Sequence, residues 1–334
     1  MKFKTLLFIF IIPVFLFSEV IFLEIEEPEI QQQHFMTNLP QNLEPGKPMI
    51  PYISTKILLP MGEKFTNLEV NFSVSGKPVD NVYINFARQQ QPISQNFNTP
   101  TKRDDLIYLN NEFFPQNNFE ILGTQRLKGY DVLFVNLFPY KYNPVSKQVS
   151  WFKNAEVNVN TEFDEITFEI QNKFLVSNSK TQQEISDLVD NSRNISTYNK
   201  SYSYFSRDLP DPENPFQMII ITDTDQAPWF DEFVNWKIAQ GIQTGIFLTS
   251  EIYDNYTGVD NQDKVRNFII DAYAVYSTTA IPLEYVLFGG DDEIIPIRGV
   301  RGQVGGTIDN HMPCDMYYSC LEGSWDGNGN GIYG

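Results

Sequence analysis

The sequence predicts two folded domains, an antiparallel β-rich domain followed by an α/β domain with a parallel sheet. Between about residues 20 and 170, short runs alternate apolar and polar side chains between turn sequences, as half-buried strands require. From Met218 onward, apolar runs alternate with segments of helical period, an order typical of parallel strands joined by crossover helices. A chain of 334 residues is also too long for one ordinary domain and suits two.

Residues 1–18 have the pattern of a secretory signal peptide. Lys2 and Lys4 precede a twelve-residue apolar run from Leu6 to Phe17, and Ser18 is a small residue at a plausible cleavage point. The run is shorter than the roughly 20 apolar residues that a membrane-spanning helix needs; an uncleaved anchor is the alternative. We therefore predict a secreted or cell-surface protein with no membrane span once the signal is removed.

Residues 19–170 are predicted to form a β-sandwich or a related antiparallel fold. The runs 70–74 and 82–86 alternate strictly, and Gly76-Lys-Pro78 between them is a turn signal. Residues 130–137 form a strongly β-prone run.

Residues 171–215 are predicted to be a polar, proline-rich linker with one modest helix from Thr181 to Val189. Between Asp208 and Pro215, three prolines remove backbone donors and fix φ. Because proteolytic nicking concentrates in exposed segments of this kind, we predict processing at Arg207. An incidental surface arginine is the alternative.

Residues 216–334 are predicted to begin with three parallel strands at 218–221, 244–248 and 284–288. A helix from about Asp225 to Gly241 follows the first strand, with its apolar residues on one face. The helix before the third strand is the most periodic segment of the chain. Its stripe consists of Val265, Phe268, Ile269, Ala272, Tyr273 and Tyr276.

Composition limits the partners and the role of the cysteines. The formal net charge of −18, from 42 acidic and 24 basic residues, argues against nucleic acid as a partner. Cys314 and Cys320 are six residues apart, which in a strand is roughly 20 Å, whereas a disulfide tolerates at most about 7 Å between Cα atoms. They could pair only across a tight turn, or with partners outside this sequence.

Near the C-terminus the sequence contains the first half of an EF-hand-type calcium loop. Asp326, Asn328 and Asn330 alternate, and Ile332 would offer its carbonyl oxygen. We expect structural calcium of weak affinity, since only one carboxylate is present. A glycine-rich turn is the alternative, because Asp-Gly and Asn-Gly favour turns.

Other candidate sites are weak. Gly289-Gly-Asp-Asp-Glu293 follows the third strand and is predicted to be an acidic turn that could support a site, because open α/β sheets place ligands at strand ends. The turn 222–226 lacks the glycines of a dinucleotide site. His34 is expected to be incidental, and His311 is a poor partner for the cysteines, because dyads usually come from separate loops.

Several segments, in this order and spacing, resemble the gingipain family of secreted cysteine peptidases. In the C-terminal half they are 218–222, 233–237, 265–269, 285–289, 315–318 and 325–334. Gly46–Pro51, Ile57–Pro60, Tyr142–Pro144 and Val149–Trp151 are similar to the propeptide of that family.

The resemblance implies a β-sandwich-like prodomain and an α/β, caspase-like peptidase domain that is truncated at its C-terminal end. It implies a zymogen that hydrolyses protein or peptide substrates through a Cys–His dyad, with the prodomain packed on its own peptidase domain. No residue here matches the family's His-Gly or cysteine motif, so both catalytic residues are expected after Gly334 and this chain is expected to be inactive. One alternative is a non-catalytic, calcium-dependent binding or adhesion module; another is an inhibitor that acts through its prodomain.

Overall fold

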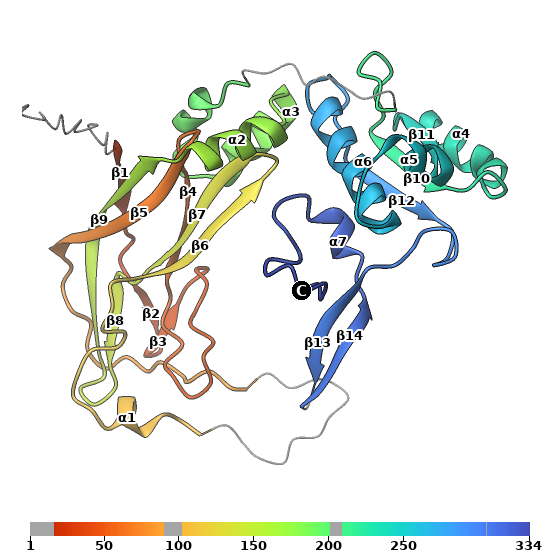
Figure 1. The fold of residues 1–334 in the computed structure, drawn as a ribbon. Coiled ribbons are helices and arrows are strands. Elements are labelled where there is room, and N and C mark those ends of the chain that lie inside the picture. The colour runs from red at the N-terminus through yellow and green to blue at the C-terminus, as the bar shows by residue number, and fades with distance from the viewer. Residues whose placement is uncertain (1–16, 90–101, 201–208, 305) are drawn as a thin grey trace, which may run out of the picture. The chain divides into compact units, whose positions relative to one another are not determined.

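Figure 1 shows the computed structural model, which describes residues 17–89, 102–200, 209–304 and 306–334. The chain forms two compact units, and each unit includes a segment that is separate from its main part in the sequence. The N-terminal unit consists of Met1–Phe168 and Gln183–Tyr198, and the C-terminal unit of Glu169–Gln182 and Asn199–Gly334.

The N-terminal unit contains two antiparallel sheets. Their strands are β1 (Phe17–Glu24), β4 (Ile53–Leu58), β5 (Glu63–Ser75), β6 (Phe119–Leu127), β7 (Tyr130–Leu137), β8 (Tyr140–Asn143) and β9 (Gln148–Phe163). One sheet has the order β1-β9-β5, with β8 paired to the first residues of β9, and the other has the order β4-β7-β6. A short strand pair, β2 (Glu29–Gln31) and β3 (His34–Met36), and the one-turn helix α1 (Asp105–Tyr108) lie in the connections.

The two sheets share a hydrophobic core, and this explains the alternating pattern of β9. Buried and less buried residues alternate along β9 because successive side chains point to opposite faces of a sheet. The core consists of Ile21, Ile57, Leu59, Leu68, Val70, Leu133, Val135, Leu137, Val157 and Val159. These residues come from both sheets, and their burial favours folding of this unit.

The predicted linker at 171–215 is wrong over much of its length, because the structure contains three helices in or beside it. They are α2 (Glu165–Phe174), α3 (Ser179–Leu188) and the 3-10 helix η1 (Ser192–Thr197). Of these, α3 corresponds to the modest helix expected at 181–189. The polar composition hides this structure because some amides are buried and bonded: Asn191 Oδ1 accepts from Leu58 N at 2.7 Å, and Asn191 Nδ2 donates to Leu58 O at 2.9 Å.

The C-terminal unit contains the predicted parallel sheet. Its strands are β10 (Met218–Thr222), β11 (Thr244–Leu248) and β12 (Tyr285–Gly289), in the order β11-β10-β12. Their bounds lie within one residue of the predicted ranges. The central strand β10 is buried over its full length, as a parallel strand covered on both faces requires.

Helices and a hairpin complete the C-terminal unit. They are η2 (Ala227–Phe230), α4 (Asp231–Ala239), α5 (Thr249–Asn255), α6 (Asn261–Tyr276), α7 (Met316–Ser319) and the pair β13 (Gly299–Val304) and β14 (Thr307–Pro313). The stripe predicted for α6 packs in the core, where Val265 and Phe268 are fully buried. In α4, by contrast, Ile238 is 42% exposed, so the apolar face predicted for this helix is only partly covered.

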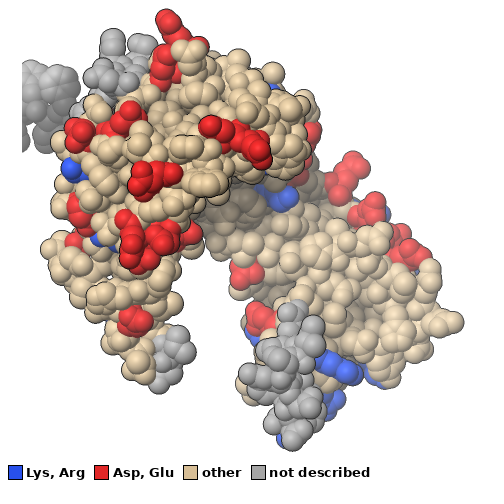
Figure 2. Space-filling model, turned by 90° about the vertical axis from the view of Figure 1, so that its right-hand side faces the viewer, with Lys and Arg blue, Asp and Glu red and all other residues tan. Residues whose placement is uncertain are grey.

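The surface is acidic, as the composition requires. On the face shown in Figure 2, acidic side chains are spread widely and basic side chains are few. This agrees with the formal net charge of −18.

Gly76, directly after β5, permits a close approach to a buried tryptophan. A Cβ atom there would lie 2.0 Å from Trp151 Cε2, and the indole is held in place because Trp151 Nε1 donates to Lys77 O at 3.0 Å. We expect Gly76→Ala to lower the free energy of unfolding by about 1–3 kcal/mol, since overpacking forces the ring or the backbone to shift.

Urea unfolding followed by tryptophan fluorescence measures this effect. Ser75→Ala is the matched control, because Ser75 is exposed and directly precedes Gly76. Equal unfolding midpoints for the two variants would contradict the packing argument.

Candidate functional site

The carboxyl ends of the three parallel strands lie at one edge of the sheet, where open α/β folds place their ligands. Thr222 is paired in register with Leu248 on one side and with Gly289 on the other. The Thr222 hydroxyl donates to the Gly289 carbonyl. Gly289 itself is required by packing, because a Cβ atom there would lie 2.6 Å from the ring of Phe230.

Acidic turns follow two of these strands, and their aspartate carboxylates accept hydrogen bonds from the backbone of the same turns. Asp223 Oδ1 accepts from the backbone N–H of Gln226 at 2.8 Å, and Asp291 Oδ1 accepts from that of Glu293 at 3.1 Å. The turn predicted after the third strand is therefore confirmed. Across the described part of the chain, no three His, Cys, Asp or Glu side chains gather into a possible metal-ion site.

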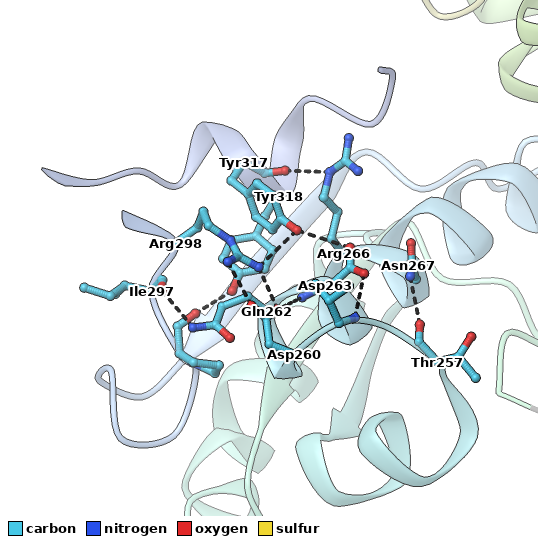
Figure 3. A network of polar contacts seen from close by, with 12 residues as sticks. Thr257, Asp260, Gln262, Asp263, Arg266, Asn267, Ile297, Arg298, Tyr317 and Tyr318 are labelled. Carbon is cyan, nitrogen blue, oxygen red and sulfur yellow. Dashed lines mark hydrogen bonds and ion pairs between the residues drawn. The ribbon is translucent and has the colours of Figure 1, made fainter. Parts of the chain in front are cut away.

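The N-terminal end of α6 carries the best-developed polar network of this unit (Figure 3). Asp260 is the N-cap residue and accepts from Asp263 N at 2.9 Å. Arg298, which precedes β13, donates to both carboxylate oxygens of Asp260, at 2.7 and 2.9 Å. A bidentate pair of this kind is the strongest geometry for an arginine and a carboxylate.

This geometry shifts the pKa values of Asp260 and Arg298. Burial would raise the pKa of Asp260, but the hydrogen bonds from Arg298 and Asp263 and the charge of Arg298 outweigh it, so the pKa lies below its usual value. Burial works against the charge of Arg298 as well, yet Asp260 and Tyr317 raise its pKa. Both groups are therefore held in their charged forms.

Tyr317, in α7, lies between two arginines. The guanidinium of Arg298 lies 4.5 Å from the centre of the Tyr317 ring, and that of Arg266 lies 5.2 Å from it. Such cation–π contacts are favourable, more so when water is excluded. Burial raises the pKa of Tyr317 to about 12, so its hydroxyl keeps its proton; it donates to Asp263 at 3.3 Å.

Arg266 fixes the chain that follows α7. This buried side chain of α6 donates to the carbonyl oxygens of Tyr317 at 3.0 Å and of Cys320 at 2.8 Å. Longer bonds of 3.3 Å reach the carbonyls of Glu322 and Gly323. One helix residue thereby satisfies backbone acceptors that a short helix and an irregular segment would otherwise leave unpaired.

The network extends to both ends of the predicted calcium loop. The rings of Trp325 and Tyr333 pack edge-on against Tyr317, with centroids 6.0 and 5.8 Å away. Arg298 also lies 3.9 Å from the centre of the Tyr333 ring. Gly334 N donates to Trp325 O at 2.9 Å, which closes the loop.

The structure brings together the side chains that the sequence singled out in this loop. Asp326 accepts from the backbone N–H groups of Asn330 and Gly331, both at 2.9 Å. Asn328 Oδ1 accepts from Asn330 N at 3.1 Å, and Asn330 Oδ1 accepts from Ile332 N at 2.8 Å. The oxygens of three alternating side chains thus turn back onto the loop.

The histidines and cysteines do not form a site. His34 and His311 are exposed on strands β3 and β14, and neither bonds to a cysteine among the described residues. Both cysteines are free; Cys314 is partly buried and Cys320 is exposed. The side chain of Ser18, like residues 1–16 and Arg207, lies outside the described residues.

Sequence reasoning missed the arginine–tyrosine network. Arg298, Arg266 and Tyr317 lie far apart in the sequence, and no spacing rule connects them. The one available signal was Arg266 itself, a cation directly after Val265 in the apolar stripe of a helix.

No helix in the described part of the chain is long and apolar enough to cross a membrane.

Comparison with known proteins gives two family matches. The model of peptidase family C25 matches residues 211–330, and the model of the C25 propeptide matches residues 15–204. No curated protein matches the sequence.

Two structures of Porphyromonas gingivalis proteins show similarity. A chain in the complex of the RgpB pro- and mature domains is 16% identical, with 53% of this chain and 92% of that chain covered and a TM-score of 0.38. A structure on the zymogenic latency of gingipain K is 18% identical, with 44% of this chain and 82% of that chain covered and a TM-score of 0.32.

The Asp260–Arg298 pair predicts an acid-sensitive contribution to stability. Because the pKa of Asp260 is lowered from 3.8, its contribution is present at pH values above the unfolded-state pKa and is lost as pH falls through the folded-state pKa. We expect Asp260→Asn to cost about 1–3 kcal/mol at pH 7, since it leaves a buried arginine without its counter-ion.

Urea unfolding at pH 7 and at pH 3 measures this difference. The gap between wild type and Asp260→Asn should narrow at the lower pH, whereas the exposed control Asp292→Asn should show no gap at either pH. A gap that is unchanged between the two pH values would show that the pair does not act through charge.

Proposed function

We propose that this chain, which belongs to the C25 propeptide family and matches peptidase family C25 after that segment, is the precursor of a secreted endopeptidase. It would hydrolyse proteins or peptides through a Cys–His dyad. The observation that carries this proposal is the order of the two matches, which is that of a zymogen. The cysteine-peptidase chemistry comes to the chain by its family.

The described fold supports the architecture of such a zymogen. Two antiparallel sheets on a common core support a β-sandwich-like prodomain. The three-stranded parallel sheet with its crossover helices supports a caspase-like peptidase domain. We further propose export through residues 1–18 with cleavage after Ser18, processing at Arg207, and packing of the prodomain on its own peptidase domain.

We place the catalytic dyad beyond Gly334. Neither cysteine of this chain bonds to a histidine among the described residues, and the side chain of His311 is exposed on a hairpin. A nucleophile needs a base within about 3 Å, so Cys314 and Cys320 are not proposed for that role.

The first test compares peptide hydrolysis by residues 1–334 with that of a longer product of the same reading frame. We expect no thiol-dependent hydrolysis from residues 1–334 and hydrolysis that alkylation abolishes from the longer product. Activity of residues 1–334 that disappears in Cys314→Ser or Cys320→Ser would overturn the placement of the dyad. A longer product that binds calcium and lacks activity would favour the calcium-dependent binding module.

We also propose that residues 326–332 hold a structural calcium ion. Side-chain oxygens of Asp326, Asn328 and Asn330 turn into the loop, and hard oxygen donors of this kind, with the carbonyl of Ile332, suit calcium. The bound ion would fix the loop between Trp325 and Tyr333. With one carboxylate the dissociation constant should lie at roughly 10⁻⁴–10⁻³ M, as in extracellular modules.

Calorimetric titration and thermal unfolding with and without calcium test this site. Asp326→Ala should reduce the affinity at least about tenfold, because it removes the only charged ligand. Asp309→Ala, an exposed aspartate on β14, is the matched control and should bind as wild type does. A wild-type chain whose unfolding temperature does not respond to millimolar calcium would contradict the proposal.

A further inference from the structure

A segment from the propeptide part of the sequence belongs to the C-terminal unit. Residues 169–182 fall within the match to the C25 propeptide, yet they cluster with Asn199–Gly334. The next residues, 183–198, return to the N-terminal unit. The propeptide part of the chain is therefore divided between the two units before the predicted processing point.

An ion pair links this segment to the amino edge of the parallel sheet. Lys180 Nζ lies 3.0 Å from Glu284 Oε1, and Glu284 directly precedes β12. The other oxygen of Glu284 accepts from Gln217 Nε2 at 3.0 Å, and Gln217 directly precedes β10. The carboxylate thus lies where two neighbouring strands begin, and the lysine reaches it from the propeptide side.

Two further contacts reach the C-terminal end of α6. The ring of Phe174 lies 6.0 Å from that of Tyr273. Lys200 Nζ donates to Leu175 O at 3.1 Å and to Ser277 Oγ at 2.6 Å, and Ser277 is the C-cap residue of α6. A cation at a helix C-terminus is favourable because the carbonyl groups there carry partial negative charge.

These contacts lie at the opposite end of α6 from the candidate functional site. Asp260 caps the N-terminus of this helix, and Ser277 caps its C-terminus. A helix of 16 residues is about 24 Å long. Ligands of open α/β sheets bind at the carboxyl ends of the strands, whereas Glu284 marks the amino ends.

We propose that residues 169–182, together with Lys200, form an anchor segment that holds the propeptide on the amino edge of the peptidase domain after the chain is cut within residues 201–208. The anchor segment retains the propeptide without occupying the carboxyl edge of the sheet, so attachment is separable from occlusion of the site. The proposal rests on the proposed zymogen function for the cut itself.

Apolar burial and charge have different parts in this attachment. Phe174, Leu175 and Val176 are consecutive and buried, with exposed fractions of 7%, 0% and 2%. Of these, Phe174 contacts Tyr273 of α6, and apolar contacts of this kind favour association, whereas the partly exposed pair Lys180–Glu284 contributes less and is screened by salt. The pair instead fixes which surface the segment meets.

The test cuts the full chain with a protease that has no other role in the system. The recognition sequence of a site-specific endopeptidase replaces residues within 201–208, and the cut protein is analysed by size-exclusion chromatography and by dissociation kinetics. We expect the two fragments to elute together. Because an added protease makes the cut, the result does not depend on processing at Arg207 or on peptidase activity. Sequencing the secreted protein tests the processing point, and activity assays test the peptidase function.

Charge reversal identifies the surface. Lys180→Glu and Glu284→Lys should each speed dissociation roughly fivefold, and the double exchange should recover most of the loss, since it restores an attractive pair. Lys128→Glu is the matched control, because Lys128 forms a similar ion pair with Glu184 at 2.8 Å inside the N-terminal unit. Its dissociation rate should equal that of the wild type.

Phe174→Ala tests the apolar contact of the anchor segment with Tyr273. Circular dichroism of the uncut variant shows whether it folds. It should speed dissociation at least about tenfold. Wild-type fragments that separate at once, or charge-reversal variants that behave like Lys128→Glu, would overturn the proposal.

Discussion

The bidentate pair between Arg298 and Asp260 joins parts of the C-terminal unit that are distant in the sequence. Asp260 begins α6, and Arg298 lies on the connection from β12 to β13, with Tyr317 and Tyr333 stacked on its guanidinium. Its Nε has no hydrogen-bond partner among the described residues, so the two rings and the carboxylate provide its known contacts. Removing any one of them would leave a buried charge less well compensated.

Much of the fold follows from local sequence patterns. The parallel strands are short apolar runs, and the stripe of α6 repeats with helical period, so both were predictable from side-chain spacing alone. The helices within 165–198 were not, because their polar residues look solvated in the sequence. Asn191 is an example: its side-chain amide forms hydrogen bonds with the backbone of Leu58 in place of water, and only the tertiary structure reveals this.

The candidate site also has a part that was predictable from the sequence and a part that was not. In the loop 326–332, alternation of oxygen-bearing side chains is a local property, and the structure does turn them back onto the loop. The support for that loop was not predictable, because Arg266 and Tyr317 meet through packing of α6 against α7. A stacked guanidinium has no fixed sequence spacing, whereas an Asx-rich loop has one.

The few basic side chains of this chain differ in how strongly salt screens their interactions. Acidic residues outnumber basic ones, 42 to 24, so not every carboxylate can have a basic partner of its own. Arg266 and Arg298 are buried, and their interactions are screened little by salt. The Lys180 side chain is 62% exposed, and its interaction is screened more. The C-terminal unit therefore combines salt-resistant contacts of α6 with α7 and Arg298 with a salt-sensitive contact at the amino edge of its sheet. The first kind suits a permanent framework, and the second suits the releasable attachment that we propose for residues 169–182.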